Sequence, residues 1–367
     1  MKFRAAVLRQ PKTPITIETI ETAELQPTDV LVRVGAAGLC HTDLEVIEGQ
    51  LVYPMPIVLG HETAGTIEQV GSAVSPKRRG EKVVLSWNPH CGHCFHCERN
   101  QPILCETYIG HGPQAVQFDG TTRLRLGGAA LRTMFYIAGF AEYAIVTAGC
   151  AIAMPADMPL DRACLIGCGV MTGVGAAIHT SNVRPGETVA VIGCGGVGLA
   201  AINGASIAGA GRIIAIDLSP GKDNMARQFG ATDFICSKDT DPVKAVMDMT
   251  GGGVHHSFEA IGLGKTAEQA FNMLRRGGTA NVIGMIPIGQ NVTLMGAAFL
   301  GEKRIQGSAM GSNRFPVDMP RFIDFYLAGK LKLDEMISRR IKLEEINDAF
   351  AEMKTGQIAR SVITFDA

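Results

Sequence analysis

The feature that most limits the possible fold is a glycine-rich turn between an apolar strand and a helical segment. Residues 188–192 have the β-branched, apolar pattern of a buried strand, and Gly-Cys-Gly-Gly-Val-Gly follows at 193–198. An alanine-rich run to Ala210 predicts a helix, and residues 212–217 predict a second strand. Such a strand–turn–helix–strand unit builds a parallel sheet, because parallel strands need a crossover helix between them.

The spacing of the glycines indicates a binding role for this turn. Its residues are Gly193, Gly195, Gly196, Val197 and Gly198. A G-x-G-x-x-G turn admits a dinucleotide pyrophosphate to the helix N-terminus, where free N–H groups and the helix dipole favour an anion. Asp217, 19 positions after the last glycine, would bind the adenosine ribose and repel a 2′-phosphate, which favours NAD over NADP. Lys222 lies either near the same ribose or on the plain surface.

The pattern of strands continues beyond this unit. Residues 233–236, 256–260 and 279–284 read as further strands, separated by helical spans. Regular alternation of strands and helices predicts a doubly wound parallel sheet, and hence an α/β fold class.

Length and composition restrict the class of protein. A chain of 367 residues favours two domains, and a net charge of -1 gives no bulk attraction to nucleic acid or to a membrane. We find no long apolar run that predicts a membrane span and no signal-peptide core, so we expect a cytoplasmic protein. In that compartment ten cysteines favour metal binding over disulfides.

Two short motifs bring candidate metal ligands into the first 62 residues. Residues 40–43 read Cys-His-Thr-Asp, and Gly60-His61-Glu62 follows. Zinc prefers thiolate and neutral imidazole, which Cys40 and His61 supply. Cys168, set among glycines that permit a close approach, is the candidate third ligand. Three protein ligands would leave the fourth position of the metal open for a substrate.

A second group of cysteines has a tighter spacing. Two successive Cys-x-x-Cys steps and a fourth cysteine occur in the lobe at about 88–107, at Cys91, Cys94, Cys97 and Cys105. Four thiolates complete a tetrahedral shell around one ion, so this predicts a structural zinc without an open position. Two disulfides, or cysteines without a ligand role, are the alternative interpretations.

These motifs together resemble the zinc-containing medium-chain alcohol dehydrogenases, nearest to the bacterial aryl- and benzyl-alcohol dehydrogenases. The resemblance implies a GroES-like β-barrel catalytic domain at 1–169 and 310–367 and a Rossmann coenzyme domain at 170–309. It also implies two zinc ions and NAD, a cleft between the domains for the nicotinamide and catalytic zinc, and a homodimer or homotetramer formed through edge strands near 304–308.

The resemblance also assigns roles at the catalytic metal. Thr42 would take the proton of an alcohol whose oxygen binds at the open position, and hydride would pass to nicotinamide. Asp43 would orient the ligand histidine, and Glu62 would modulate metal coordination. His41 would contact the cofactor pyrophosphate, and Arg360 would belong to the cofactor-binding set.

One residue departs from the pattern of this family. Its best-known members end the proton relay at a histidine, and Glu45 holds that position here. Either Glu45 accepts the proton, or the relay ends at the cofactor ribose and water. We favour the second, because an ordinary surface glutamate ionises well below neutral pH.

Alignment to the pocket positions of the family defines a substrate wall. It consists of Trp87, Met134, Phe135, Met285 and Ala309. An uncharged, partly aromatic wall favours a primary aryl or medium-chain alcohol or aldehyde over a polyol. Trp87 could instead be a plain core residue.

Two other functions stay open at this stage. An S-hydroxymethylglutathione dehydrogenase would need cations at the pocket mouth, and Arg123, Arg125 and Arg132 lie in the intervening loop. A cofactor-binding sensor with a silent site is the third interpretation, although the complete ligand set argues against it.

Overall fold

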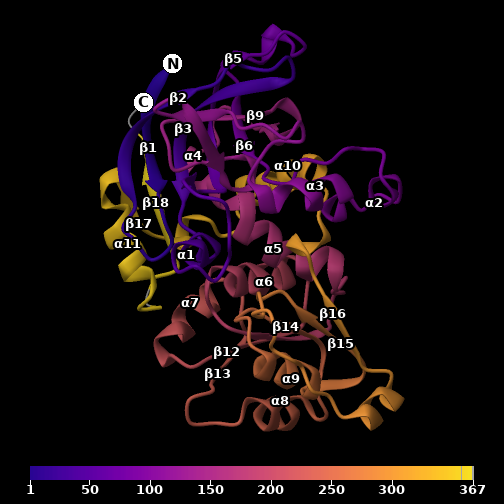
Figure 1. The fold of residues 1–367 in the computed structure, drawn as a ribbon. Helices are drawn as coiled ribbons and strands as arrows, with labels where there is room; N and C mark the ends of the chain where they lie inside the picture. The colour runs from indigo at the N-terminus through magenta and orange to yellow at the C-terminus, as the bar shows by residue number, and fades with distance from the viewer. Residues whose placement is uncertain (357, 366–367) are drawn as a thin grey trace. The chain divides into compact units, whose positions relative to one another are not determined.

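The computed structural model describes residues 1–356 and 358–365, which form two compact units. Unit 1 consists of Met1–Cys168, Arg314–Ala328 and Leu333–Ala367, and unit 2 consists of Gly169–Asn313 and Gly329–Lys332. The C-terminal part of the chain therefore returns to the N-terminal part, and strand β18 lies beside strand β3 (Figure 1).

Unit 1 contains a closed β-barrel, as the resemblance implied. In order around the barrel, its strands are β1 (Lys2–Leu8), β2 (Thr16–Thr22), β7 (Leu124–Leu126), β8 (Ala129–Thr133) and β4 (Ile57–Val58). Polar and apolar residues alternate at the start of β1, so Phe3, Ala5 and Val7 enter the barrel core, where Ile20 and Leu131 meet them.

A seven-stranded sheet accompanies the barrel in unit 1. Its strands are, in order, β10 (Ala151–Ala153), β6 (Lys82–Leu85), β5 (Glu62–Val70), β3 (Asp29–Gly38), β18 (Arg360–Thr364) and β17 (Ile337–Ile341), with β9 (Tyr143–Thr147) also paired to β3. Strand β3 begins near the buried pair of Asp29 and Arg123, whose Oδ2 and Nε atoms are 2.6 Å apart.

The helices of unit 1 are short, except for one near the C-terminus. They are α1 (His41–Ile47), α2 (Phe95–Glu98), α3 (Glu106–His111), α4 (Leu160–Leu165), α10 (Phe315–Leu327) and α11 (Ile346–Met353). Single helical turns occur at η1 (Pro76–Arg78), η2 (Pro102–Leu104), η3 (Gly112–Gln114), η4 (Met134–Tyr136), η5 (Ala148–Cys150), η11 (Asp334–Met336) and η12 (Leu343–Glu345).

Unit 2 has the predicted doubly wound parallel sheet. Its strand order is β13 (Asp233–Cys236), β12 (Arg212–Asp217), β11 (Thr188–Ile192), β14 (Val254–Glu259), β15 (Leu274–Val282) and β16 (Arg304–Gly307), and all neighbouring pairs are parallel. The order reverses between β11 and β14, so the carboxyl ends of these two strands mark the point at which such sheets bind ligands.

The helices of unit 2 connect and cover these strands. They are α5 (Met171–Gly175), the π-helical η7 (Ala176–Thr180), α6 (Gly196–Ile207), α7 (Asp223–Gln228), α8 (Pro242–Thr250) and α9 (Gly264–Asn272), with short 3-10 helices at η8 (Pro220–Lys222), η9 (Gly296–Gly301) and η10 (Met310–Ser312). The sheet core includes Ala190, Ile192, Ile214, Val254 and Phe271, which are all buried.

One continuous helical stretch runs from Leu160 to Thr180 through α4, the π-helical η6 (Ile166–Val170), α5 and η7. By length and composition it could cross a membrane, which the sequence reading did not anticipate. However, 83% of its apolar window is buried inside the protein, which is typical of a core helix.

Candidate metal centres and coenzyme loop

The buried candidate centre lies in unit 1 and draws on three separate parts of the chain. The ligand atoms of Cys40, His61, Glu62 and Cys168 all lie within 4.8 Å of one another. Cys40 is the N-cap of α1, Glu62 begins β5, and Cys168 lies in η6. His61 is fully buried, and the two cysteines are at most 8% exposed. The structure thus brings together the three residues predicted to bind the catalytic metal.

Asp43 holds two of these groups in place. Its Oδ1 atom lies 3.2 Å from His61 Nδ1 and accepts a bond of 3.0 Å from the Gly60 amide, while Oδ2 accepts the Cys40 amide at 3.1 Å. His61 Nε2 is buried and has no hydrogen-bond partner among the described residues. A buried nitrogen without a partner next to two thiols fits a metal ion that prefers nitrogen and sulfur ligands.

The protonation of the cluster also fits a cation. A hydrogen bond with the Cys168 thiol, together with the charge of the nearby His61, holds the pKa of Cys40 well below its usual value despite burial. The same contact, together with burial, raises the pKa of Cys168. Burial lowers the pKa of His61, but the charges of Asp43 and Cys40 outweigh that effect and raise it well above its usual value. One anionic sulfur is therefore already favoured before an ion binds.

Glu62 and Arg360 form a buried pair beside this cluster. The Arg360 Nη2 atom lies 3.5 Å from Glu62 Oε1, and the two side chains are 9% and 0% exposed. Burial raises the pKa of Glu62 to about 8, although the Arg360 charge opposes the shift. The structure thus pairs Arg360, predicted to bind cofactor, with the acidic residue predicted to modulate the metal.

Helix α1 presents the predicted relay residues. Thr42 Oγ1 lies 3.7 Å from Cys40 Sγ, and the side chain is partly exposed. His41 is exposed at the first position of the helix. Glu45 is half-buried, and burial together with the Cys40 charge raises its pKa to about 7. Glu45 is therefore not the ordinary surface glutamate on which our preference for a relay without it depended.

Aromatic side chains pack against the ring of the candidate ligand His61. Its ring centroid lies 5.3 Å from that of Phe135 and 6.4 Å from that of Trp87, and these two rings are 4.6 Å apart. Trp87 Nε1 is buried without a hydrogen-bond partner among the described residues. Two of the five residues predicted to form the substrate wall therefore contact the candidate centre.

The other three wall residues have different environments. Met134 is completely buried next to Phe135, whereas Met285 is 50% exposed and Ala309 is exposed, both in unit 2. The sequence reading missed Tyr53, Tyr108 and Phe315, whose rings lie 5.8 to 6.1 Å from those of Trp87 or Phe135. No local pattern marks these three residues, because they reach the wall from distant segments.

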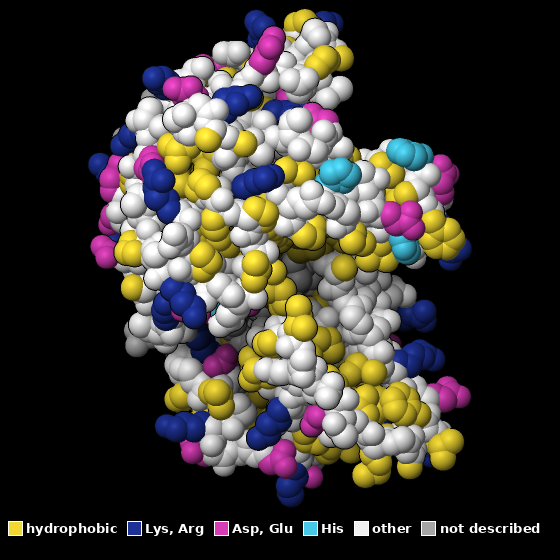
Figure 2. Space-filling model, in the orientation of Figure 1, with side chains coloured by type: hydrophobic (Ala, Val, Ile, Leu, Met, Phe, Trp, Pro, Cys, Tyr) yellow, Lys and Arg dark blue, Asp and Glu magenta, His cyan; other side chains and the backbone are white. Residues whose placement is uncertain are grey.

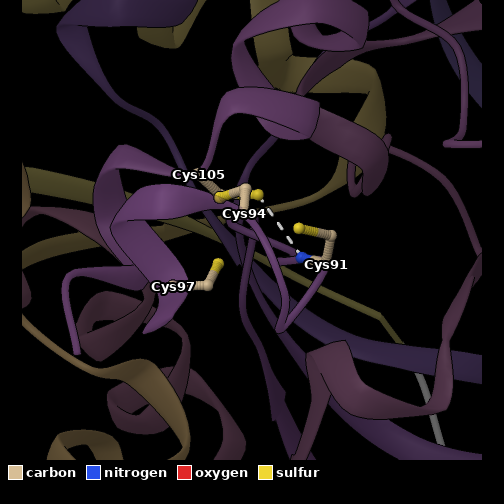
Figure 3. Close-up of side chains that lie close together, drawn as sticks. All are labelled: Cys91, Cys94, Cys97 and Cys105. Carbon is tan, nitrogen blue, oxygen red and sulfur yellow. Dashed lines mark hydrogen bonds between the residues drawn. The ribbon is translucent and has the colours of Figure 1, made fainter. Parts of the chain in front are cut away.

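The second candidate centre lies in the lobe formed by α2, α3 and the turns around them. The sulfur atoms of its four cysteines lie within 4.8 Å of one another and surround a common space (Figure 3). The Cys91 amide donates to Cys105 Sγ at 3.3 Å. A backbone hydrogen bond from His93, together with the Thr107 side chain, lowers the pKa of Cys91 to about 5. The four thiols are unpaired and suit one tetrahedral ion.

Histidine side chains also gather on the surface of this lobe (Figure 2). His93 is exposed, and its Nδ1 atom bonds to the Cys91 carbonyl oxygen at 2.9 Å. His96 bonds to the Gln101 side chain at 3.3 Å. In the part of the chain that the structure describes, neither histidine joins the metal-ligand cluster, which leaves the predicted set of four thiolates.

The glycine-rich turn of unit 2 has the shape that a pyrophosphate needs. A Cβ atom on Gly198 would lie 1.7 Å from the Gly193 carbonyl oxygen, so only glycine fits there. Gly195 is the N-cap of α6, and a Cβ atom on it would meet nothing within 4 Å. The backbone N–H groups of this helix end are therefore accessible to an anion.

Asp217 stands at the end of β12 with its carboxylate held by the backbone. Its Oδ2 atom accepts the Cys194 amide at 2.8 Å, and Oδ1 accepts the Ser219 amide at 2.9 Å. Lys222 is only 9% exposed, which removes the interpretation of this lysine as a plain surface residue. Asp217 therefore lies at the carboxyl end of a parallel strand, where sheets of this kind bind ligands.

Comparisons with known proteins agree with this geometry. Residues 26–156 match the family described as "Alcohol dehydrogenase GroES-like domain", and residues 196–327 match "Zinc-binding dehydrogenase". An alcohol dehydrogenase zinc-binding domain protein from Burkholderia ambifaria is 34% identical over 100% of both chains, with a TM-score of 0.96. Benzyl alcohol dehydrogenase from Acinetobacter calcoaceticus is 31% identical over 100% of both chains, with a TM-score of 0.95.

A zinc-binding dehydrogenase from Sinorhizobium meliloti, solved with NADP bound, is 27% identical over 100% of both chains, with a TM-score of 0.84. The fold and the two clusters define an oxidoreductase built from a GroES-like domain and a dinucleotide-binding domain. The chain belongs to the zinc-containing medium-chain alcohol dehydrogenase family.

Proposed function

We propose that this protein is an NAD- and zinc-dependent alcohol dehydrogenase that interconverts a primary, apolar aryl or medium-chain alcohol and its aldehyde. The observation that carries this proposal is the buried centre of two thiols and one unpartnered imidazole nitrogen, next to an aromatic wall. Cys40, His61 and Cys168 would hold a catalytic zinc, and the four cysteines of the lobe would hold a structural zinc.

The bound zinc would supply Lewis acidity toward an alcohol oxygen. Asp43 holds Nδ1 of His61, so Nε2 is the nitrogen that would release its proton and bind the metal. Thr42 Oγ1, close to Cys40 Sγ, is the proposed first acceptor of the alcohol proton. Trp87 and Phe135 exclude water and contact the carbon skeleton of the substrate.

The choice of NAD depends on Asp217. Its carboxylate, held by two backbone amides, would bind the adenosine ribose hydroxyls and repel the 2′-phosphate of NADP. His41, Lys222 and Arg360 are proposed to support cofactor binding. The relative from Sinorhizobium meliloti was solved with NADP bound, so the preference of this protein for NAD over NADP needs a direct assay with both cofactors.

The buried position of Arg123 argues against the S-hydroxymethylglutathione alternative. Its Nε atom lies 2.6 Å from Asp29 Oδ2, Nη2 lies 2.8 Å from Asp119 Oδ2, and the side chain is 5% exposed. A guanidinium already paired with two carboxylates cannot also hold a glutathione carboxylate without losing those bonds. Arg125 and Arg132 use Nη1 to donate to backbone oxygens at 3.2 and 3.3 Å.

We further propose the domain assignment 1–169 plus 310–367 and 170–309, a cytoplasmic location, and a homodimer or homotetramer. Strand β16 ends the sheet of unit 2, and Arg304, Gln306 and Gly307 are exposed along it. Exposed apolar side chains lie in the connection before it (Figure 2), at Ile288, Met295, Phe299 and Leu300. An open strand edge beside an apolar surface favours pairing with a second copy.

A substrate panel tests the function. Benzyl alcohol, hexanol, sorbitol, and formaldehyde with glutathione are assayed with NAD and with NADP on protein of measured zinc content. We expect two zinc ions per chain and a kcat/KM for benzyl alcohol or hexanol with NAD about 100-fold above that for sorbitol. Turnover only of the glutathione adduct would favour the alternative, and two zinc ions without oxidation of any alcohol would support a silent site.

A further inference from the structure

Glu259 is a buried carboxylate at the point where the strand order of unit 2 reverses. It is the last residue of β14, which pairs directly with β11, and its side chain is completely buried. The sequence patterns assigned no role to this residue. Burying a glutamate side chain costs free energy of folding unless its oxygens form hydrogen bonds or ion pairs.

One oxygen of Glu259 organises the turn that follows its own strand. Oε1 accepts the Ile261 amide at 2.9 Å, the Gly262 amide at 2.8 Å and the Thr266 hydroxyl at 2.7 Å. Thr266 lies in the first turn of α9. A single carboxylate oxygen thus binds the turn and the start of the next helix together.

The same residue reaches the turn after the neighbouring strand β15. Its carbonyl oxygen accepts the Ile283 and Gly284 amides, each at 2.9 Å. Oε2 has no hydrogen-bond partner among the described residues, and it lies 2.6 Å from the position of a Cβ atom on Gly284. Gly262 has a φ of +92°, and a Cβ atom on it would lie 2.5 Å from the Met285 carbonyl oxygen. The two turns are therefore locked against each other.

The turn after β14 also supports the glycine-rich turn. A Cβ atom on Gly193 would lie 2.7 Å from Ile261 Cγ1, and the Ala260 amide donates to the Ile192 carbonyl oxygen at 2.9 Å. Any shift of residues 260–262 would consequently displace the backbone of the glycine-rich turn and of the turn that carries Met285.

The strand order assigns a part of the cofactor to each side. Strand β12, which carries Asp217 for the adenosine ribose, lies on one side of β11, and strands β14 and β15 lie on the other. A dinucleotide whose pyrophosphate binds at the turn after β11 extends across this point. Its nicotinamide half therefore faces the turns that Glu259 holds together.

We propose that Glu259 is a positioning residue for the nicotinamide half of the cofactor. It does not touch the cofactor; it fixes the backbone of residues 260–262 and 283–285, on which that half rests. This inference depends on the proposed use of NAD. Glutamine is a poor replacement for the carboxylate. Its amide would put two N–H donors at the buried position where Oε2 makes no hydrogen bond, and its neutral oxygen would bind the three donors more weakly.

The test compares NADH with AMP, which occupies only the adenosine side. For Glu259→Gln we expect the dissociation constant of NADH to rise roughly tenfold, while that of AMP stays within about twofold. Thr266→Val, which removes one of the three donors at a partly exposed position, should raise the NADH constant by about threefold. NADH binding is followed by its own fluorescence, AMP by calorimetry, and folding by thermal denaturation.

Ser257→Ala is the matched control. Ser257 is also buried on β14, and its hydroxyl donates to the Ala270 carbonyl oxygen at 2.7 Å, away from the strand end. Ser257→Ala should lower the melting temperature, but it should not change the dissociation constant of NADH relative to that of AMP. Equal increases for NADH and AMP in Glu259→Gln would show general structural damage and overturn the proposal, as would an unchanged NADH constant. If Glu259→Gln does not fold, wild-type NADH affinity in Thr266→Val overturns it. Wild-type protein that binds no NADH would instead refute the proposed function.

Discussion

Within residues 1–356 and 358–365, two clusters of four residues each bring their ligand atoms within 4.8 Å, but they are built differently. The cluster of Cys40, His61, Glu62 and Cys168 mixes sulfur, nitrogen and oxygen atoms and is buried throughout. The lobe cluster has only sulfur atoms, and three of its four cysteines are partly exposed. Both have the ligand chemistry of zinc, so ligand type alone does not separate their roles.

The difference lies in how each cluster is held. The lobe cysteines come from a single segment of 15 residues, and backbone amides are the main cause of the lowered pKa of Cys91 and Cys94. The buried cluster collects its members from distant segments, and charged side chains surround it, with Asp43 on His61 and Arg360 on Glu62. A closed local shell stabilises a loop, whereas a centre with polarising neighbours can act on a bound substrate.

The largest expected effect is the loss of activity when a member of the buried cluster is replaced. Cys168→Ser should remove one zinc per chain and lower kcat for alcohol oxidation on the order of 1,000-fold or more, because about 4 kcal/mol of transition-state stabilisation depends on the metal. Zinc analysis and steady-state kinetics measure both. Cys164→Ser, at a buried cysteine outside either cluster, should retain two zinc ions. Retained activity in Cys168→Ser would contradict the ligand assignment.

The second prediction is that losing a cysteine of the lobe cluster lowers the stability of the protein and not its activity. Cys105→Ser removes the completely buried member of the lobe cluster and should cost roughly 3 kcal/mol, or about 6 to 12 °C in melting temperature. The kcat of the protein that stays folded should remain within about twofold of wild type, since the buried centre is intact. Thermal denaturation with zinc analysis measures the effect, and Cys236→Ser in unit 2 is the control. An unchanged melting temperature would show that the lobe needs no metal.

The third prediction concerns the charged side chains that surround the buried cluster. Asp43→Asn keeps the shape of the side chain but removes the charge that faces His61 Nδ1 at 3.2 Å. We expect the affinity of the buried centre for zinc to fall by about 10- to 100-fold, with no change at the lobe. Competition with a chromophoric chelator should then resolve one weakened site and one unchanged site. Two equally weakened sites would remove the distinction.

The smallest effect concerns the proton path near the buried centre. The pKa of Glu45 is about 7, so its carboxylate becomes available as a base as the pH rises through 7. Wild-type kcat/KM for alcohol oxidation should rise over that interval, and Glu45→Gln should flatten the rise and lower the rate at pH 8 by about threefold to tenfold. Glu48→Gln, at the end of the same helix, is the control. An identical pH–rate profile in Glu45→Gln would place the end of the relay at the ribose and water.

Local patterns in the sequence were sufficient to predict the parallel sheet of unit 2 and the cysteine lobe of unit 1. The strand, glycine turn and helix from Thr188 to Ile207 depend on neighbouring residues, so the doubly wound sheet could be predicted and is confirmed. The four lobe cysteines are likewise close in the chain, and their spacing alone brought them into one cluster. Short-range geometry is set by residue type and spacing, which the sequence displays directly.

What the sequence could not supply depends on long-range packing and burial. It identified Cys40, His61, Asp43 and Cys168, but not that Tyr53, Tyr108 and Phe315 reach the aromatic wall from distant segments. It treated Glu45 as an exposed acid, whereas half-burial beside Cys40 raises the pKa to about 7. It gave no sign of Glu259, whose donors belong to a turn and a helix that form only when the sheet assembles. Residue types thus determined the candidate ligands and the glycine turn. The tertiary structure decided their neighbours, because desolvation and contact depend on what folding brings next to each side chain.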